Sequence, residues 1–154
     1  MTRYELFKFF HVVGAIAWVG GGIGLTILGR RLVAAKDHVT LISLNEQGKA
    51  LGNRLFLPAF LLTLGFGVAM VIDTPAIGFG DLWILIGFGG IVASGAVEGL
   101  VGQRAARAFT AAVERHGMGS AQVDTAAARL TLGGTLDVLV MLVVVWAMVA
   151  RPTL

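Results

Sequence analysis

Four long apolar stretches divide the chain, and each is bounded by glycine, proline or charged residues. They cover approximately residues 6–28, 55–72, 82–101 and 130–150. A helix needs about 20 apolar residues to cross ~30 Å of hydrocarbon, and single strands cannot satisfy their backbone polar groups in lipid. The pattern therefore predicts an all-α integral membrane protein, a four-helix bundle formed by a single domain over residues 1–154.

The segments between these stretches predict where the helices begin and end. Asp73-Thr74-Pro75 ends the second stretch. The segment 103–116 is rich in alanine and arginine, lacks proline and is followed by Gly117, which is typical of a helix C-cap. Ser120 is then expected to be the N-cap of a helix that runs into the fourth stretch. The third and fourth helices should therefore extend beyond the bilayer into the cytoplasm as a helical hairpin.

The distribution of lysine and arginine predicts the orientation. The two long connections carry most of these residues, namely Arg30, Arg31, Lys36, Lys49 and Arg54 in the first, and Arg104, Arg107, Arg115 and Arg129 in the second. The opposite side has only Arg3, Lys8 and Arg151. By the positive-inside rule, both long connections are cytoplasmic and both termini lie outside. The net charge of +3 is thus explained by an anionic membrane surface, and no nucleic-acid partner is expected.

Composition narrows the class of protein further. Hydrophobic residues make up 56% of the chain and charged residues only 14%, with a mean hydropathy of +0.85. The absence of cysteine excludes disulfides, thiolate metal sites, iron–sulfur clusters and thiol catalysis. The first apolar stretch is too long for a signal-peptide core and is followed by Gly29-Arg30-Arg31 in place of a cleavage site, so we expect a retained membrane helix.

Ionisable residues inside a span are costly and often functional, and His11 is the one histidine in these stretches. At 100° per residue it shares a helix face with Gly14, Trp18 and Gly22, whose small members allow a helix or a flat ligand to approach. Together with Met141 on the fourth stretch, these residues form a candidate cofactor pocket. His11 would ligate haem iron or another metal there. The alternative is a neutral histidine that bonds to a carbonyl or hydroxyl of a neighbouring helix.

A second polar group consists of Arg54, Glu98 and Asp137, all toward the cytoplasmic side of their spans. An arginine between two carboxylates would offset the penalty of burying them. The group could serve as a proton or cation relay or as a substrate anchor, or it could be a structural ion-pair cluster. His38 and His116 fall in the long connections and are expected to be solvated.

The first stretch contains the pattern F-H-x6-W-x-G-G, formed by Phe10, His11, Trp18, Gly20 and Gly21. This pattern resembles the start of copper-resistance D-like proteins, of the four-helix membrane type of protoporphyrinogen oxidase, and of an uncharacterised family of four-span predicted integral membrane proteins. The last resemblance covers nearly the whole chain, and its further positions are Arg54, Pro58, residues 79–83, Asp137 and Arg151-Pro152.

These resemblances imply the cytoplasmic (inner) membrane of a bacterium. In the oxidase relatives the first-helix histidine is linked with haem binding, which adds to the case for His11. A third-helix lysine of their functional site has no counterpart here, because residues 82–101 contain no lysine. The resemblance therefore implies a haem site more than it implies the oxidase activity.

The leading hypothesis from the sequence is a b-type haem-binding membrane protein with His11 as axial ligand, serving electron transfer, haem handling or sensing. A second is a non-catalytic accessory or assembly subunit of a larger membrane complex. A third is proton or metal translocation through Arg54, Glu98 and Asp137. The expected partners are the lipid bilayer and a second copy of the chain or a larger membrane complex, and no enzymatic activity is assigned.

Overall fold

The computed structural model describes residues 2–153, with the side chain of Lys49 left aside, and this part of the chain is helical and has no strand. The first span is built from α1 (Arg3–Ala15), η1 (Ile16–Gly20) and α2 (Gly21–Ala34). It is followed by α3 (His38–Glu46), α4 (Gly48–Leu51), η2 (Gly52–Phe56) and α5 (Leu57–Asp73). The second half comprises α6 (Leu82–Ala96), η3 (Val97–Gly102), α7 (Gln103–His116) and α8 (Ala121–Ala150).

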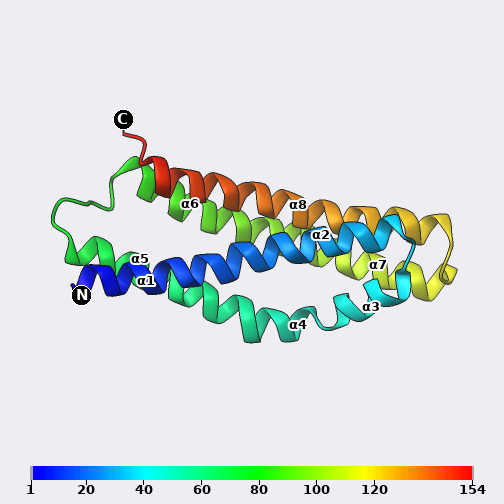
Figure 1. Ribbon diagram of the computed structural model, residues 1–154. Helices are drawn as coiled ribbons and strands as arrows, with labels where there is room; N and C mark the ends of the chain where they lie inside the picture. The colour runs from blue at the N-terminus through cyan, green and yellow to red at the C-terminus, as the bar shows by residue number, and fades with distance from the viewer. Residues whose placement is uncertain (1, 154) are drawn as a thin grey trace.

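Four continuous helices are long and apolar enough to cross a membrane, and they confirm the four expected spans. They are Arg3–Ala34, Gly52–Asp73, Leu82–His116 and Ala121–Ala150. Both described ends of the chain lie at one end of the elongated bundle, which we call the termini end (Figure 1). The turns from α2 to α3 and from α7 to α8 lie at the other, the hairpin end (Figure 1). The all-α four-helix architecture and the helical hairpin are confirmed.

The helix ends follow the local sequence. The Ser120 hydroxyl accepts a hydrogen bond from the backbone N–H of Val123, so it caps α8 as predicted. Gly117 ends α7 with a φ of 71°, a left-handed conformation that glycine adopts without a steric penalty. A capping box of Thr2 and Glu5 begins α1. The sequence analysis missed it, although T-x-x-E before an apolar run is a typical signal for one.

Three π-helical segments interrupt the spans, and the sequence analysis expected none of them. The segment η1 lies in the first span, η2 begins the second and η3 lies in the third. Hydrogen bonds from residue i to i+5 add about one residue to a turn, so the residues that follow are rotated from their α-helical positions. The 100° projection that placed Gly22 on the face of His11 therefore does not hold for residues that follow η1.

The hairpin end is closely packed. Its core contains Leu41 of α3, Phe109 of α7, and Val123 and Ala127 of α8, all buried. His38 also belongs to this region and is only 5% exposed, so the expectation that it is solvated is wrong. The ring is covered by an element distant in sequence, since Asp124 of α8 lies 3.1 Å from the His38 Nε2. His116 is exposed, as expected.

At the termini end the four spans form two pairs. The helix α1 packs on α5, and a Cβ atom at Gly14 would lie 2.8 Å from the carbonyl oxygen of Ala59. The helix α6 packs on α8, where Gly87 makes room for the side chain of Met148 and Gly90 for that of Val144. Toward the hairpin end the first span changes its packing partner, because α2 packs on α8. The two pairs therefore diverge toward the termini end.

Candidate functional site: the His11 cavity

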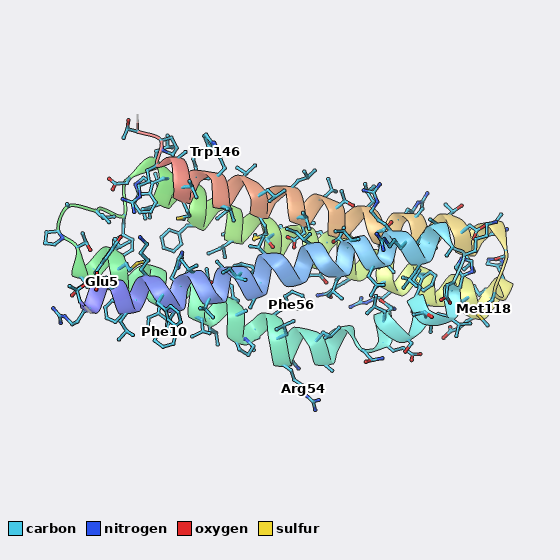
Figure 2. All side chains as sticks on the ribbon, in the orientation of Figure 1. Glu5, Phe10, Arg54, Phe56, Met118 and Trp146 are labelled. Atoms are coloured by element: carbon cyan, nitrogen blue, oxygen red, sulfur yellow. The ribbon has the colours of Figure 1, made fainter. Side chains whose placement is uncertain are left out.

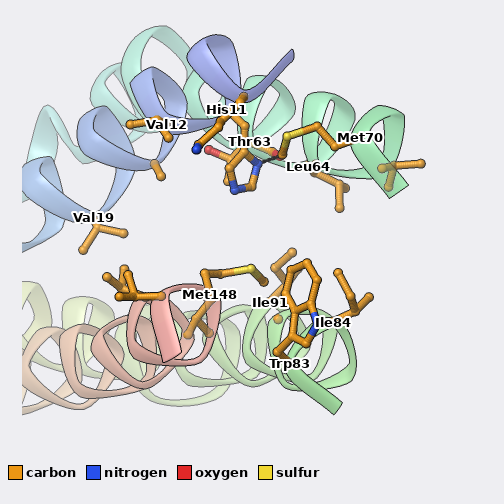
Figure 3. A pocket seen from close by; sticks show the side chains of 18 of the residues that line it. His11, Val12, Val19, Thr63, Leu64, Met70, Trp83, Ile84, Ile91 and Met148 are labelled. Carbon is orange, nitrogen blue, oxygen red and sulfur yellow. Dashed lines mark hydrogen bonds between the residues drawn. The ribbon is translucent and has the colours of Figure 1, made fainter. Parts of the chain in front are cut away.

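A cavity of about 810 Å³ lies at the termini end between the α1/α5 pair and the α6/α8 pair (Figure 3). We call it the His11 cavity, and its lining is almost entirely apolar. Protein interiors are packed to the density of organic crystals and contain few voids larger than a water molecule. A space of this volume instead falls within the range of small-molecule and cofactor pockets, about 300–1,000 Å³.

His11 extends from α1 into this cavity, and its ring is held by the neighbouring helix (Figure 3). Nδ1 lies 2.7 Å from the backbone carbonyl oxygen of Thr63 on α5. Because a carbonyl oxygen only accepts, Nδ1 carries a proton and donates this hydrogen bond, which selects the Nδ1–H tautomer of the neutral ring. The lone pair is then on Nε2. A metal-bound histidine makes the same kind of hydrogen bond through its other ring nitrogen. The observed bond is therefore compatible with two roles of His11, a metal ligand and a residue that packs α1 on α5.

Gly67 provides the space for the imidazole. A Cβ atom at this position would lie 3.0 Å from Nδ1 and 3.1 Å from Cε1 of His11. Gly67 follows Thr63 by one helical turn, so the residue that accepts the hydrogen bond and the residue that makes room lie on the same face of α5. The sequence analysis missed both, because nothing in the sequence shows which part of α5 packs against His11.

Only some of the predicted cofactor residues line the cavity. Trp18 does, and its ring packs edge to face on Phe60 with centroids 5.3 Å apart. Met141 also lines it and is buried. Gly14 does not, because it lies in the contact between α1 and α5. Gly22 does not either, and open space surrounds the position of its missing Cβ atom.

Two methionines besides Met141 line the cavity. Met70 belongs to α5, on the same wall as His11. Met148 belongs to α8 and lies on the opposite wall, across the cavity from His11 (Figure 3). Of the three methionines that line the cavity, Met148 and Met141 are therefore on the side from which a group could face His11 across a bound ligand.

The second polar group is brought together only in part. Asp137 of α8 accepts a hydrogen bond from the hydroxyl of Ser94 on α6, and Glu98 belongs to η3, which packs on α8. Arg54 is exposed and points away from the helices (Figure 2). It forms no ion pair within residues 2–153, so the expected arginine between two carboxylates is not present. Ser94 is the buried partner that the sequence analysis missed.

Bare metal ions require several protein ligands, and within the described residues no three His, Cys, Asp or Glu side chains are grouped so that they could hold one. His11 offers a single nitrogen. Such a site fits a metal whose remaining ligands come from an organic ring, as in haem. The fit of the cavity to haem rests on its volume, its apolar lining and the free Nε2.

Four apolar spanning helices around an apolar cavity define an integral membrane protein of the all-α class. The chain matches the family described as predicted integral membrane protein (DUF2269) over residues 5–152, and it belongs to that family. This confirms the expected resemblance to a family of predicted integral membrane proteins, whereas nothing supports kinship to the copper-resistance or oxidase families. No curated protein and no solved structure matches the chain.

Proposed function

We propose that the protein binds b-type haem in the His11 cavity, with Nε2 of His11 as an axial ligand. The observation that supports this most directly is the bond from Nδ1 to the Thr63 carbonyl, which assigns the lone pair of the neutral ring to Nε2, in a cavity of about 810 Å³. A second support is the lining, since apolar walls exclude water from a porphyrin ring. Bound haem would supply an iron that changes oxidation state, which suits electron transfer, sensing or haem handling.

Met148 is the residue that we favour as the second axial ligand. A second residue that would hold the iron is expected on the wall opposite His11, whereas Met70 of α5 lies on the same wall as His11. Met148 lies across the cavity from His11 (Figure 3). A thioether opposite an imidazole raises the reduction potential of a haem, so this ligand pair would favour the reduced state.

We further propose that the protein lies in the inner membrane of a bacterium with the termini end outside. The support is the excess of lysine and arginine in the two long connections, which meet at the hairpin end (Figure 1). The haem would then lie near the outer face. A homodimer or a larger membrane complex remains the expected assembly.

The test is an absorption spectrum of the oxidised and dithionite-reduced protein, purified in detergent from haem-supplemented cells. We expect a Soret band and sharp reduced α and β bands, all lost in His11→Ala and retained in His116→Ala. His116 is a suitable control because it is exposed at the end of α7. A featureless spectrum of the wild-type protein would overturn the proposal and leave an accessory membrane subunit as the better account.

The second ligand is tested by three matched methionine variants. Met148→Leu should convert six-coordinate haem to five-coordinate haem and abolish the near-infrared band of an iron–thioether bond. Met70 and Met141 line the same cavity, and the variants Met70→Leu and Met141→Leu should leave that band in place. If the band is absent from the wild-type protein, or survives in Met148→Leu, then Met148 is not the ligand.

A further inference from the structure

The charged side chains that line the His11 cavity are both cations. Lys8 of α1 lies on one wall, and Arg151, which follows α8, lies on the other. No aspartate or glutamate belongs to the lining. A cavity with an apolar body and cations on both walls is suited to a ligand that is itself apolar but carries negative charge at one edge.

Four of the α1 residues that line the cavity lie in a row along the helix. Tyr4, Lys8, His11 and Ala15 follow one another at intervals of four, three and four residues, so they form one stripe on the helix. Of these residues, Tyr4 is the nearest to the start of α1, and Ala15 is the farthest from the termini end. A ligand held by the His11 ring would therefore have an apolar wall on its inner side and a cation on the side of the termini end.

Arg151 is held at the edge of the opposite wall by two features. It ends α8 in a left-handed conformation with a φ of 45° and a ψ of 57°, which non-glycine residues rarely adopt. Its guanidinium carbon lies 5.1 Å from the centre of the Trp83 ring, and Trp83 also lines the cavity. The backbone turn and the cation–π contact together keep the guanidinium beside the cavity.

The acidic residues around the termini end already have other partners. Asp73 pairs with Arg3 at 3.1 Å, and Glu5 accepts from the backbone N–H of Thr2 at 2.8 Å. Asp81 accepts from the backbone N–H of Gly78 at 3.1 Å. Within residues 2–153 no carboxylate forms an ion pair with Lys8 or Arg151. Cations at the edge of an apolar region are stabilised by an anionic partner, and this partner is absent from the described chain.

We propose that Lys8 and Arg151 bind the carboxylates of the cavity ligand, one from each wall, and that they thereby orient it with its acidic edge toward the termini end. This inference rests on the proposed function, in which the ligand is haem and the carboxylates are its two propionates. A guanidinium holds a carboxylate through paired hydrogen bonds, whereas an ammonium acts as a point charge. Arg151 should therefore contribute more to binding than Lys8.

The experiment compares haem with haem dimethyl ester, in which both propionates are esterified and uncharged. The full-length protein, prepared without haem, is titrated with each compound in detergent and followed by the Soret band. The variants are Lys8→Gln, Arg151→Gln and the double variant, with Arg3→Gln as the control. Arg3 is a suitable control because it lies at the same end but does not line the cavity.

We expect each cavity variant to lower the affinity for haem by about tenfold or more, as for the loss of one charge-assisted hydrogen bond. Their affinity for the ester should stay at the wild-type value, which also shows that the variants are folded. Arg3→Gln should bind both compounds as the wild-type protein does.

Equal affinity of the wild-type protein for haem and ester, or an equal loss for both compounds in the variants, would overturn the inference while haem binding itself stands. A wild-type protein that binds neither compound would overturn the proposed function, and this inference with it.

Discussion

The two ends of the bundle use the same spans in opposite ways. At the hairpin end, α3, α7 and α8 bury Phe109, Val123 and Ala127 almost completely. At the termini end, the four spans separate into two pairs around a cavity of about 810 Å³. The difference teaches that one bundle can combine a closed core at the hairpin end with room for a ligand at the termini end.

The change from packed to hollow coincides with a change of helix partner. The helix α1 packs on α5, whereas α2, the continuation of the same span, packs on α8. The π-helical segment η1 lies between them and contributes Trp18 and Gly20 to the cavity. Such segments are frequent at functional sites, because the extra residue redirects the side chains that follow it. The cavity therefore arises from how the first span is built.

The largest difference between the two ends should come from one large-to-small substitution in each. Phe109→Ala should lower the free energy of unfolding by about 3–5 kcal/mol, because the ring is 0% exposed and would leave a cavity. Phe88→Ala should lower it much less, because Phe88 lines the existing cavity and is 37% exposed. Unfolding in detergent, followed by helical circular dichroism, measures both. Equal losses would contradict the division into a packed end and a hollow end.

Ligand binding should stabilise the hollow end selectively. At a free haem concentration one hundred times the Kd, binding should add about 2.7 kcal/mol to the stability of the folded protein. Hydrogen exchange should slow in α1 and α5, which hold His11 and its hydrogen-bond partner, and should change little in α7. Exchange that slows equally throughout the bundle would mean that the two ends unfold as a single unit. His11→Ala should show no effect of haem.

A third comparison concerns the contact between α1 and α5, the two helices that form the His11 wall of the cavity. Gly14→Ala should lower the free energy of unfolding by about 1–3 kcal/mol through overpacking. The reason is that the new Cβ atom would lie 2.8 Å from two backbone atoms of α5, the Ala59 oxygen and the Thr63 nitrogen. Gly24→Ala is the matched control in the same span, because nothing lies within 4 Å of its Cβ position. It should be neutral or slightly stabilising. Thermal unfolding of the two variants tests the prediction, and similar melting temperatures would contradict it.

Features fixed by neighbouring residues could be read from the sequence, and features fixed by distant contacts could not. The spans, the end of α5 before Pro75, the cap at Ser120 and the turn at Gly117 follow from local chemistry, and all were predicted. His38 is buried beside Asp124, which lies in a different helix. Arg54 was placed in a cluster by its depth alone, but depth does not determine which way a side chain points around a helix.

The candidate site divides in the same manner. His11 stood out because an ionisable residue in an apolar stretch is conspicuous, and Trp18 and Met141 also proved to line the cavity. Gly22 was misplaced because a π-helical turn cannot be seen in a 100° projection. Gly67 was missed because its role exists only where α5 passes His11.

The smallest expected effect is also the most specific to His11, and it compares two glycines of α5 that are two residues apart and therefore face different sides of the helix. Gly67→Ala would place a Cβ atom 3.0 Å from Nδ1, so the ring must shift by a few tenths of an ångström. That shift weakens the 2.7 Å hydrogen bond to Thr63 that holds Nε2 toward the cavity. We expect a loss of haem affinity of up to about tenfold, equivalent to about 1.4 kcal/mol, and a displaced Soret maximum. Gly65→Ala should change neither, because its Cβ position is open. If both variants bind haem as the wild-type protein does, the orientation of the imidazole is irrelevant to binding, and His11 serves to pack α1 against α5.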